Sequence, residues 1–190
     1  FKAIRFDRVI ALSDALPMLE NLGLRILSEH PYELETEGRV IAIQDFVVQA
    51  QRPLGDLDAA RADFEDAFAR IWAGEAENDG FNRLVLELGI GWREAALIRA
   101  LARYRQQSGL DPSQAVQEQA LSAHPSVTRL ILELFRIKFD PGLDLPLEAR
   151  AAQAETAFQS VVEALQSVAS LDHDRVLRRL ALLVRAVKRT

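Results

Sequence analysis

The sequence contains no cysteine, few lysines, one methionine and no long apolar run. The absence of cysteine excludes disulfides, zinc-thiolate sites and thiol nucleophiles, and it agrees with a reducing, cytoplasmic compartment. No apolar stretch approaches the roughly 20 residues that span a bilayer, and no charged-then-apolar leader is present. The net charge of −5 opposes nonspecific binding to nucleic acid. We therefore expect a soluble chain that contacts neither membrane nor nucleic acid.

What is present is ordinary globular material. Of the 190 residues, 49% are hydrophobic and 27% are charged, enough for one large core or two small ones. Residues 1–6 have a strand pattern, and the run from Leu12 to Leu22 predicts a short helix, with Ser13 as its N-cap and Gly23 ending it.

Two further strands follow this helix. Residues 32–37 alternate apolar or Thr side chains with glutamates, which is typical of a strand with one exposed face. Residues 39–49 are apolar on both alternations near the middle, which predicts a more buried strand. The Glu37-Gly38 junction between them indicates a hairpin.

Beyond Pro53 the apolar period becomes helical. One stripe is formed by Leu57, Ala60, Phe64, Phe68, Ile71 and Trp72. The order is then β-α-β-β-α, an incomplete ferredoxin-like or ACT-like unit. The only candidate for a fourth strand is Arg83 to Leu88.

From Trp92 onward the pattern predicts helices only. Their starts are indicated at Asp111-Pro112, at His124-Pro125, after Pro141-Gly142 and at Asp172. The fold class is therefore α+β, an incomplete ACT-like unit over 1–76 followed by a mainly helical bundle over 77–190. We expect Phe158 and Leu165 to lie in the core of the bundle.

Two motifs invite a chemical interpretation, and both are weak. Gly89-Ile90-Gly91 follows an apolar run, but Glu94 occupies the place of the third small residue in a dinucleotide fingerprint, so a turn between helices is favoured. The three histidines, His30, His124 and His173, are far apart in sequence and favour loop or helix-end positions over a metal site. We expect no catalytic, cofactor-binding or metal-binding residue.

The last helix, predicted from Asp172 to Thr190, is locally basic. A solvated helix face with cations near its C-terminus is the simplest interpretation, and docking against an acidic neighbouring domain is the alternative. No glycine or proline stops this helix, so we expect it to continue or to dock in a longer protein. The candidate domain-contact residues are Arg178, Arg185 and Arg189.

Four blocks of sequence resemble the large bacterial NAD-specific glutamate dehydrogenases. They are LSDALPMLENLGLRILSEHPYEL, IQDFVVQ, GEAENDGFNRLVLELGIGWREAALIRALARY and LDHDRVLRRLALLVRAVKRT. The resemblance covers nearly the whole chain and lies upstream of that family's catalytic domain. It implies a parent enzyme that converts L-glutamate and NAD to 2-oxoglutarate and ammonia, with NAD bound outside this segment. The expected partners are other domains of the same polypeptide, with a homo-oligomer as a further possibility.

Two other functions remain open from the sequence. A stand-alone helical adaptor would explain the absence of catalytic motifs. An ACT-like amino-acid sensor would use the turn from Asp7 to Asp14, although this turn lacks the glycines that let a ligand approach backbone amides. The noncatalytic segment of a dehydrogenase, which positions, oligomerises or regulates the enzyme, is the favoured interpretation.

Overall fold

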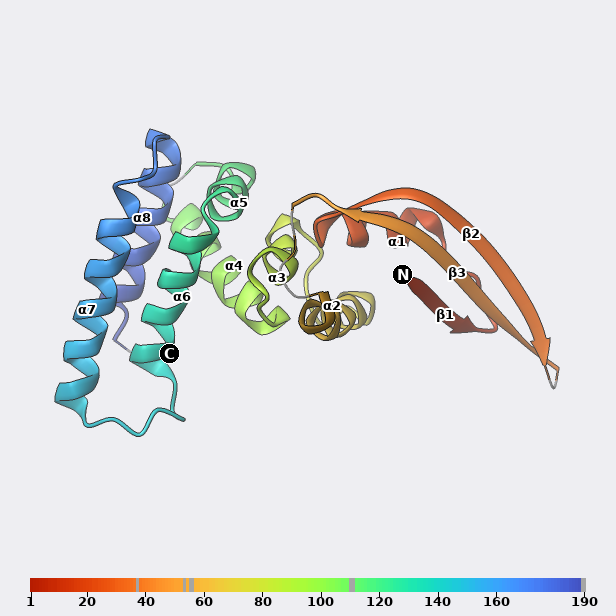
Figure 1. Ribbon diagram of the computed structural model, residues 1–190, viewed down its shortest axis with the longest axis horizontal. Coiled ribbons are helices and arrows are strands. Elements are labelled where there is room, and N and C mark those ends of the chain that lie inside the picture. Colours follow the sequence, from red (N-terminus) through yellow and green to blue (C-terminus); the bar gives the residue numbers. More distant parts are fainter. Residues whose placement is uncertain (37, 53, 55–56, 110–111, 189–190) are drawn as a thin grey trace. The chain divides into compact units, whose positions relative to one another are not determined.

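The computed structural model describes residues 1–36, 38–52, 54, 57–109 and 112–188 and confirms the α+β fold class (Figure 1). The chain forms two compact units, Phe1–Trp92 and Arg93–Thr190. Residues 77–92 belong to the first compact unit. The sequence pattern assigns them to the helical bundle. No helix among the described residues is long and apolar enough to cross a bilayer.

The first unit contains a three-stranded antiparallel sheet. Strand β3 (Arg39–Ala50) lies between β1 (Lys2–Phe6) and β2 (Leu24–Thr36). Thr36 pairs with Arg39, so the predicted hairpin has a two-residue connection, of which Glu37 lies outside the described residues and Gly38 has a φ of 77°. A positive φ at this position is typical of tight hairpins and favours glycine.

Both helices of the β-α-β-β-α order lie against one face of this sheet, here called the inner face. Helix α1 (Leu12–Asn21) buries Ala15 and Leu19 completely. Helix α2 (Leu57–Trp72) buries four members of the predicted stripe, Ala60, Phe64, Phe68 and Ile71, while the Leu57 side chain lies outside the described part of the structure. The backbone of Phe1 is hydrogen-bonded to the backbone of Phe46. The Phe1 ring makes edge contacts with the rings of Phe64 and Phe68 on α2, at centroid distances of 5.2 and 5.0 Å. The aromatic stripe thus joins α2 to the sheet.

One prediction for this unit is wrong, and the one candidate for a fourth strand is a helix. Ser13 is not the N-cap of α1: the helix begins at Leu12 with Ala11 as its cap, and no side chain caps it. Arg83 to Leu88 is helix α3, not a fourth strand. Its short apolar run fits a buried helical turn as well as a strand, and length alone does not separate the two. A 3₁₀ turn (Gly80–Asn82) precedes α3, and Asp79 caps that turn by accepting a hydrogen bond from Phe81 N.

Gly23 ends α1 as predicted, and the structure adds a second reason for glycine there. Its φ is 88°, and a Cβ at this position would lie 3.4 Å from the Cβ of Arg83 on α3. The residue therefore combines a left-handed backbone with a close approach of two elements, and a side chain would disturb both.

The second unit is helical throughout its regular structure, as expected. Its helices are α4 (Trp92–Gln107), α5 (Gln114–Ala123), α6 (Pro125–Phe139), α7 (Leu147–Leu165) and α8 (Leu171–Ala186). Pro125 occupies the first position of α6, as its sequence pattern predicted, whereas α5 begins three residues after Asp111, which lies outside the described residues.

The three C-terminal helices α6, α7 and α8 pack on one another. Phe158 and Leu165, predicted to be in the core, are 6% and 2% exposed. The predicted N-cap of α8 is wrong: Ser170, not Asp172, accepts the hydrogen bond from His173 N. The helix also ends earlier than predicted, at Ala186, because the backbone of Val187 leaves the helical conformation (φ −57°, ψ 130°).

Candidate domain-contact surfaces

Two of the three cations predicted to contact a neighbouring domain form ion pairs within their own unit. Arg178 donates from Nε and Nη2 to the two carboxylate oxygens of Asp174, at 3.1 and 2.7 Å, one helical turn earlier. This bond raises the pKa of the Arg178 guanidinium above its ordinary value. The third cation, Arg189, lies outside the described residues. The domain-contact role of this set stays a prediction.

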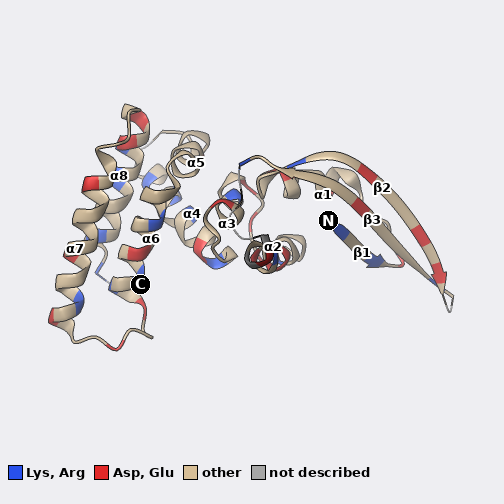
Figure 2. Ribbon diagram, viewed as in Figure 1, with Lys and Arg blue, Asp and Glu red and all other residues tan. Residues whose placement is uncertain are grey.

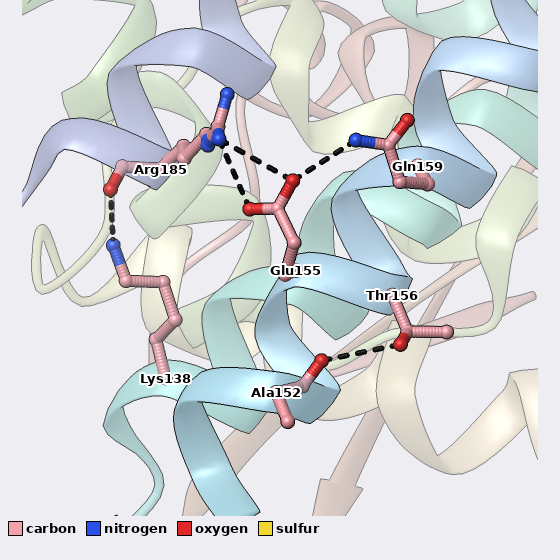
Figure 3. A network of polar contacts seen from close by, with 6 residues as sticks. All are labelled: Lys138, Ala152, Glu155, Thr156, Gln159 and Arg185. Carbon is pink, nitrogen blue, oxygen red and sulfur yellow. Dashed lines mark hydrogen bonds and ion pairs between the residues drawn. The ribbon is translucent and has the colours of Figure 1, made fainter. Parts of the chain in front are cut away.

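Arg185 links α8 to α7. Its Nη2 lies 3.0 Å from Glu155 Oε2 (Figure 3). Its guanidinium carbon lies 4.4 Å from the centre of the Phe158 ring. Gln159 donates a hydrogen bond of 2.9 Å to the same carboxylate. About half of the Arg185 side chain is still exposed, so the pair leaves donors of this arginine accessible at the surface.

Lys138, which the sequence analysis did not single out, explains where α8 ends. Its ammonium donates to the carbonyl oxygens of Val184, Arg185 and Val187, at 2.7, 2.6 and 2.9 Å (Figure 3 shows the second bond). The last carbonyls of a helix lack intrahelical partners, and a cation is favourable at that end of the helix dipole. Burial, together with the nearby charges of Lys188 and Arg185, lowers the pKa of Lys138. No local sequence pattern reveals this cap, because Lys138 is 46 residues from Val184.

The second surface is the outer face of the sheet, opposite the two helices. Cross-strand register places six apolar side chains together in two rows across the three strands. Four of them are more than half exposed: Ile4 (61%), Phe6 (55%), Tyr32 (53%) and Leu34 (53%). The other two, Ile41 and Ile43, lie on β3 between them and are partly exposed. The prediction of a buried central strand therefore holds for the inner face of β3 only.

The turn proposed for an amino-acid sensor begins with an ion pair. Asp7 has a φ of 58°, and its carboxylate accepts hydrogen bonds from Arg39 Nε and Nη2 at 3.2 and 2.8 Å. These bonds hold the pKa of Asp7 below its ordinary value. Arg39 therefore neutralises the Asp7 carboxylate at the start of this turn.

The histidines are arranged differently from the prediction. His124 caps α6 and His173 lies in the first turn of α8, and their ring nitrogens Nε2 and Nδ1 are 3.1 Å apart. The prediction of helix-end positions is correct for these two, but their 49-residue separation hid the pairing. No cluster of three or more His, Asp or Glu side chains in the described part of the chain is placed to hold a metal ion.

The glycine motif forms a turn between two helices, as favoured from the sequence. Gly89 is the left-handed C-cap of α3, with a φ of 58°, and α4 begins directly after Gly91. A dinucleotide fingerprint requires a strand before its glycines so that the pyrophosphate meets the start of the following helix. Here a helix takes that place, and the required context is missing.

Two family models match this architecture. Residues 1–62 match "Glutamate dehydrogenase, ACT3 domain", and residues 76–141 match "Glutamate dehydrogenase, helical motif 3". The first covers the sheet with α1, and the second covers α3 to α6. The sheet with α1 is thus similar in sequence to an ACT domain of glutamate dehydrogenases, and α3 to α6 are similar to a helical motif of these enzymes.

Comparison with curated proteins confirms the resemblance seen in the sequence. The chain is 41% identical to the NAD-specific glutamate dehydrogenase of Halomonas elongata over 182 residues, and 40% and 36% identical to those of Pseudomonas aeruginosa and Mycobacterium tuberculosis. These matches cover 95 to 100% of the chain but only 11 to 12% of the relatives. The chain thus corresponds to a small region of these large bacterial enzymes.

Proposed function

We propose that this chain is a noncatalytic segment of a large NAD-dependent glutamate dehydrogenase. In that enzyme it would position the catalytic domain or hold subunits together, while NAD binding and the oxidative deamination of L-glutamate to 2-oxoglutarate occur elsewhere in the polypeptide. The likeness to a small region of three NAD-specific glutamate dehydrogenases supports the identity of the parent enzyme.

The observation that carries the contact role is the outer face of the sheet. Four large apolar side chains on the two edge strands, β1 and β2, are each more than half exposed, and the partly exposed Ile41 and Ile43 of β3 join them into one continuous surface. Single exposed apolar residues are normal, whereas a contiguous patch of this kind marks an interaction site. A sheet with both helices on its other face has this one free to meet another domain or subunit.

The positions of the lysines support the noncatalytic part of the proposal. A glutamate dehydrogenase needs a lysine and an acidic group in a closed cleft for carbonyl polarisation and proton transfer. Lys2 is an exposed edge residue paired with Asp45, Lys138 caps a helix, and Lys188 is exposed. The carboxylates in the grooves that these lysines line, Glu65 and Glu155, are each paired with an arginine.

The test is to place charge on the outer face in the intact enzyme. Ile4→Glu combined with Tyr32→Glu should leave this chain folded, because both side chains are mostly exposed, but should lower the oligomer mass or the specific activity of the enzyme. Leu171→Glu is the matched control, since Leu171 is 82% exposed and belongs to α8 of the second unit. An unchanged mass and activity in the double variant would contradict the contact role.

A further inference from the structure

A groove of about 430 Å³ lies among α6, α7 and α8 in the second unit. Its walls come from the last turn of α6, the first turns of α7 and the segment that follows α8. The apolar residues lining it are Leu134, Phe139, Leu147, Ala151, Ala154 and Val187. Leu147 is 83% exposed and Ala151 is also exposed, so part of this lining faces solvent.

The exposed lining is the unpaired part of a helical stripe. Positions 147, 151 and 154 continue the line of α7 that is buried further along at Phe158, Val161 and Leu165. The second half of this stripe packs in the bundle, whereas the first half has an apolar surface at helical spacing without a packed partner among the described residues. A surface with this period fits the side-chain ridges of another helix.

The charge around the groove is strongly one-sided. Its lining contains four cations, Lys138, Arg150, Arg185 and Lys188, and one carboxylate, Glu155, although the chain as a whole is acidic. Glu155 is already paired with Arg185. Figure 2 shows that acidic positions are prominent elsewhere, for example along β2. A positive rim around an apolar floor favours a partner with carboxylates flanking an apolar face.

The hydrogen bonds of these cations argue against a small anion as the occupant. All three donors of Lys138 are used by carbonyls of the α8 end. The terminal nitrogens of Arg150 donate to the carbonyl oxygens of Ile137, Asp140 and Leu143. A phosphate or small carboxylate needs direct donors, but these two cations supply mainly a positive field. Only Arg185 and Lys188, at the rim, can reach a partner's side chains.

We infer that this groove receives an acidic amphipathic helix from another part of the same polypeptide. This inference rests on one part of the proposed function, namely that the chain is a segment of a longer enzyme. The relatives contain about eight times as much chain as this segment, which provides ample sequence for such a helix. A tethered helix also has a high effective concentration, on the order of millimolar, so a shallow charged groove is enough to hold it.

The test is photo-crosslinking in the intact enzyme. A benzoylphenylalanine at position 151 should capture one peptide from outside residues 1–190, with carboxylates and apolar residues at helical spacing. The same probe at Gln153, which is exposed on a different side of α7, is the matched control and should capture that peptide much less. Enzyme assembled from a mixture of isotopically light and heavy subunits shows whether each cross-link lies within one copy.

Charge is tested separately. Lys188→Glu should lower the yield of the cross-link from position 151 about fivefold, because it reverses an exposed rim charge, and high salt should reduce the difference. Arg175→Glu, near the start of α8 and outside the groove, should leave the yield unchanged. The inference would be overturned by a cross-link between light and heavy copies or by capture of a basic segment. It would equally be overturned by equal capture at position 153 or by an unchanged cross-link yield in Lys188→Glu. None of these results depends on the outer face of the sheet, so the proposed function would stand or fall on its own test.

Discussion

Replacing Phe158 by alanine should severely destabilise the second unit. The ring is 6% exposed on α7, is packed in the core of the bundle and lies beneath the Arg185 guanidinium. Removing a buried phenylalanine ring costs about 3 to 5 kcal/mol, of which the loss of a partly exposed cation-π contact accounts for roughly 0.5 to 1 kcal/mol. Since domains of this size are stable by only about 5 to 15 kcal/mol, a large fraction of the free energy of unfolding would be lost.

Urea unfolding followed by far-ultraviolet circular dichroism measures this loss. Trp72 belongs to the first unit and Trp92 begins α4 at the boundary, so tryptophan fluorescence does not report directly on the core of the second unit. Leu147→Ala is the matched control on the same stripe, because its side chain is 83% exposed and its removal should change the free energy by no more than about 0.5 kcal/mol. If Phe158→Ala unfolds at the same urea concentration as Leu147→Ala, the assignment of this face of α7 to the core is wrong.

Two other predictions concern the chain's role in the enzyme. The isolated chain should neither reduce NAD with glutamate nor bind NAD measurably, because the glycine motif forms a turn between helices; submillimolar binding in a calorimetric titration would contradict this. Reversing the charge of Arg178, Arg185 and Arg189 together, by substitution with glutamate, should leave the isolated chain folded, since each exposed ion pair contributes on the order of 0 to 1 kcal/mol, but should impair assembly or activity of the intact enzyme. Full activity and an unchanged oligomeric state of the triple glutamate variant would rule out a contact role for these three arginines.

Local periodicity predicted the elements best where the buried side chains are large. The stripe of α2 and the core positions of α7 were both correct because apolar residues there repeat with the helical period over several turns. On α4, by contrast, the large Tyr104 is 63% exposed, whereas Arg99 is 4% exposed. Small alanines, Ala95 and Ala102, form the buried line there, and a search for large apolar residues passes over them.

Contacts between distant residues could not be predicted from the sequence. His124 pairs with His173, and Lys138 caps a helix that ends 46 to 49 residues later. The position of each residue is already explained within its own helix, as a histidine at a helix end or a cation in the last turn of α6. No sequence pattern therefore indicates that it also contacts a second helix. Only the packing of α6 against α8 brings these groups together.

The sequence and the structure differ in how much of each apolar pattern is buried. The pattern of β3 is apolar on both faces, yet only its inner face, with Ala42 and Phe46, is buried. The stripe of α7 extends over the whole helix, yet Leu147 in its first turn is exposed while Leu165 in its last is buried. A periodic apolar pattern shows that a face is suited to a partner, and the structure shows which turns already have one. The uncovered remainders are the outer face of the sheet and the groove beside α7, and each therefore defines a place where another part of the enzyme is expected to bind.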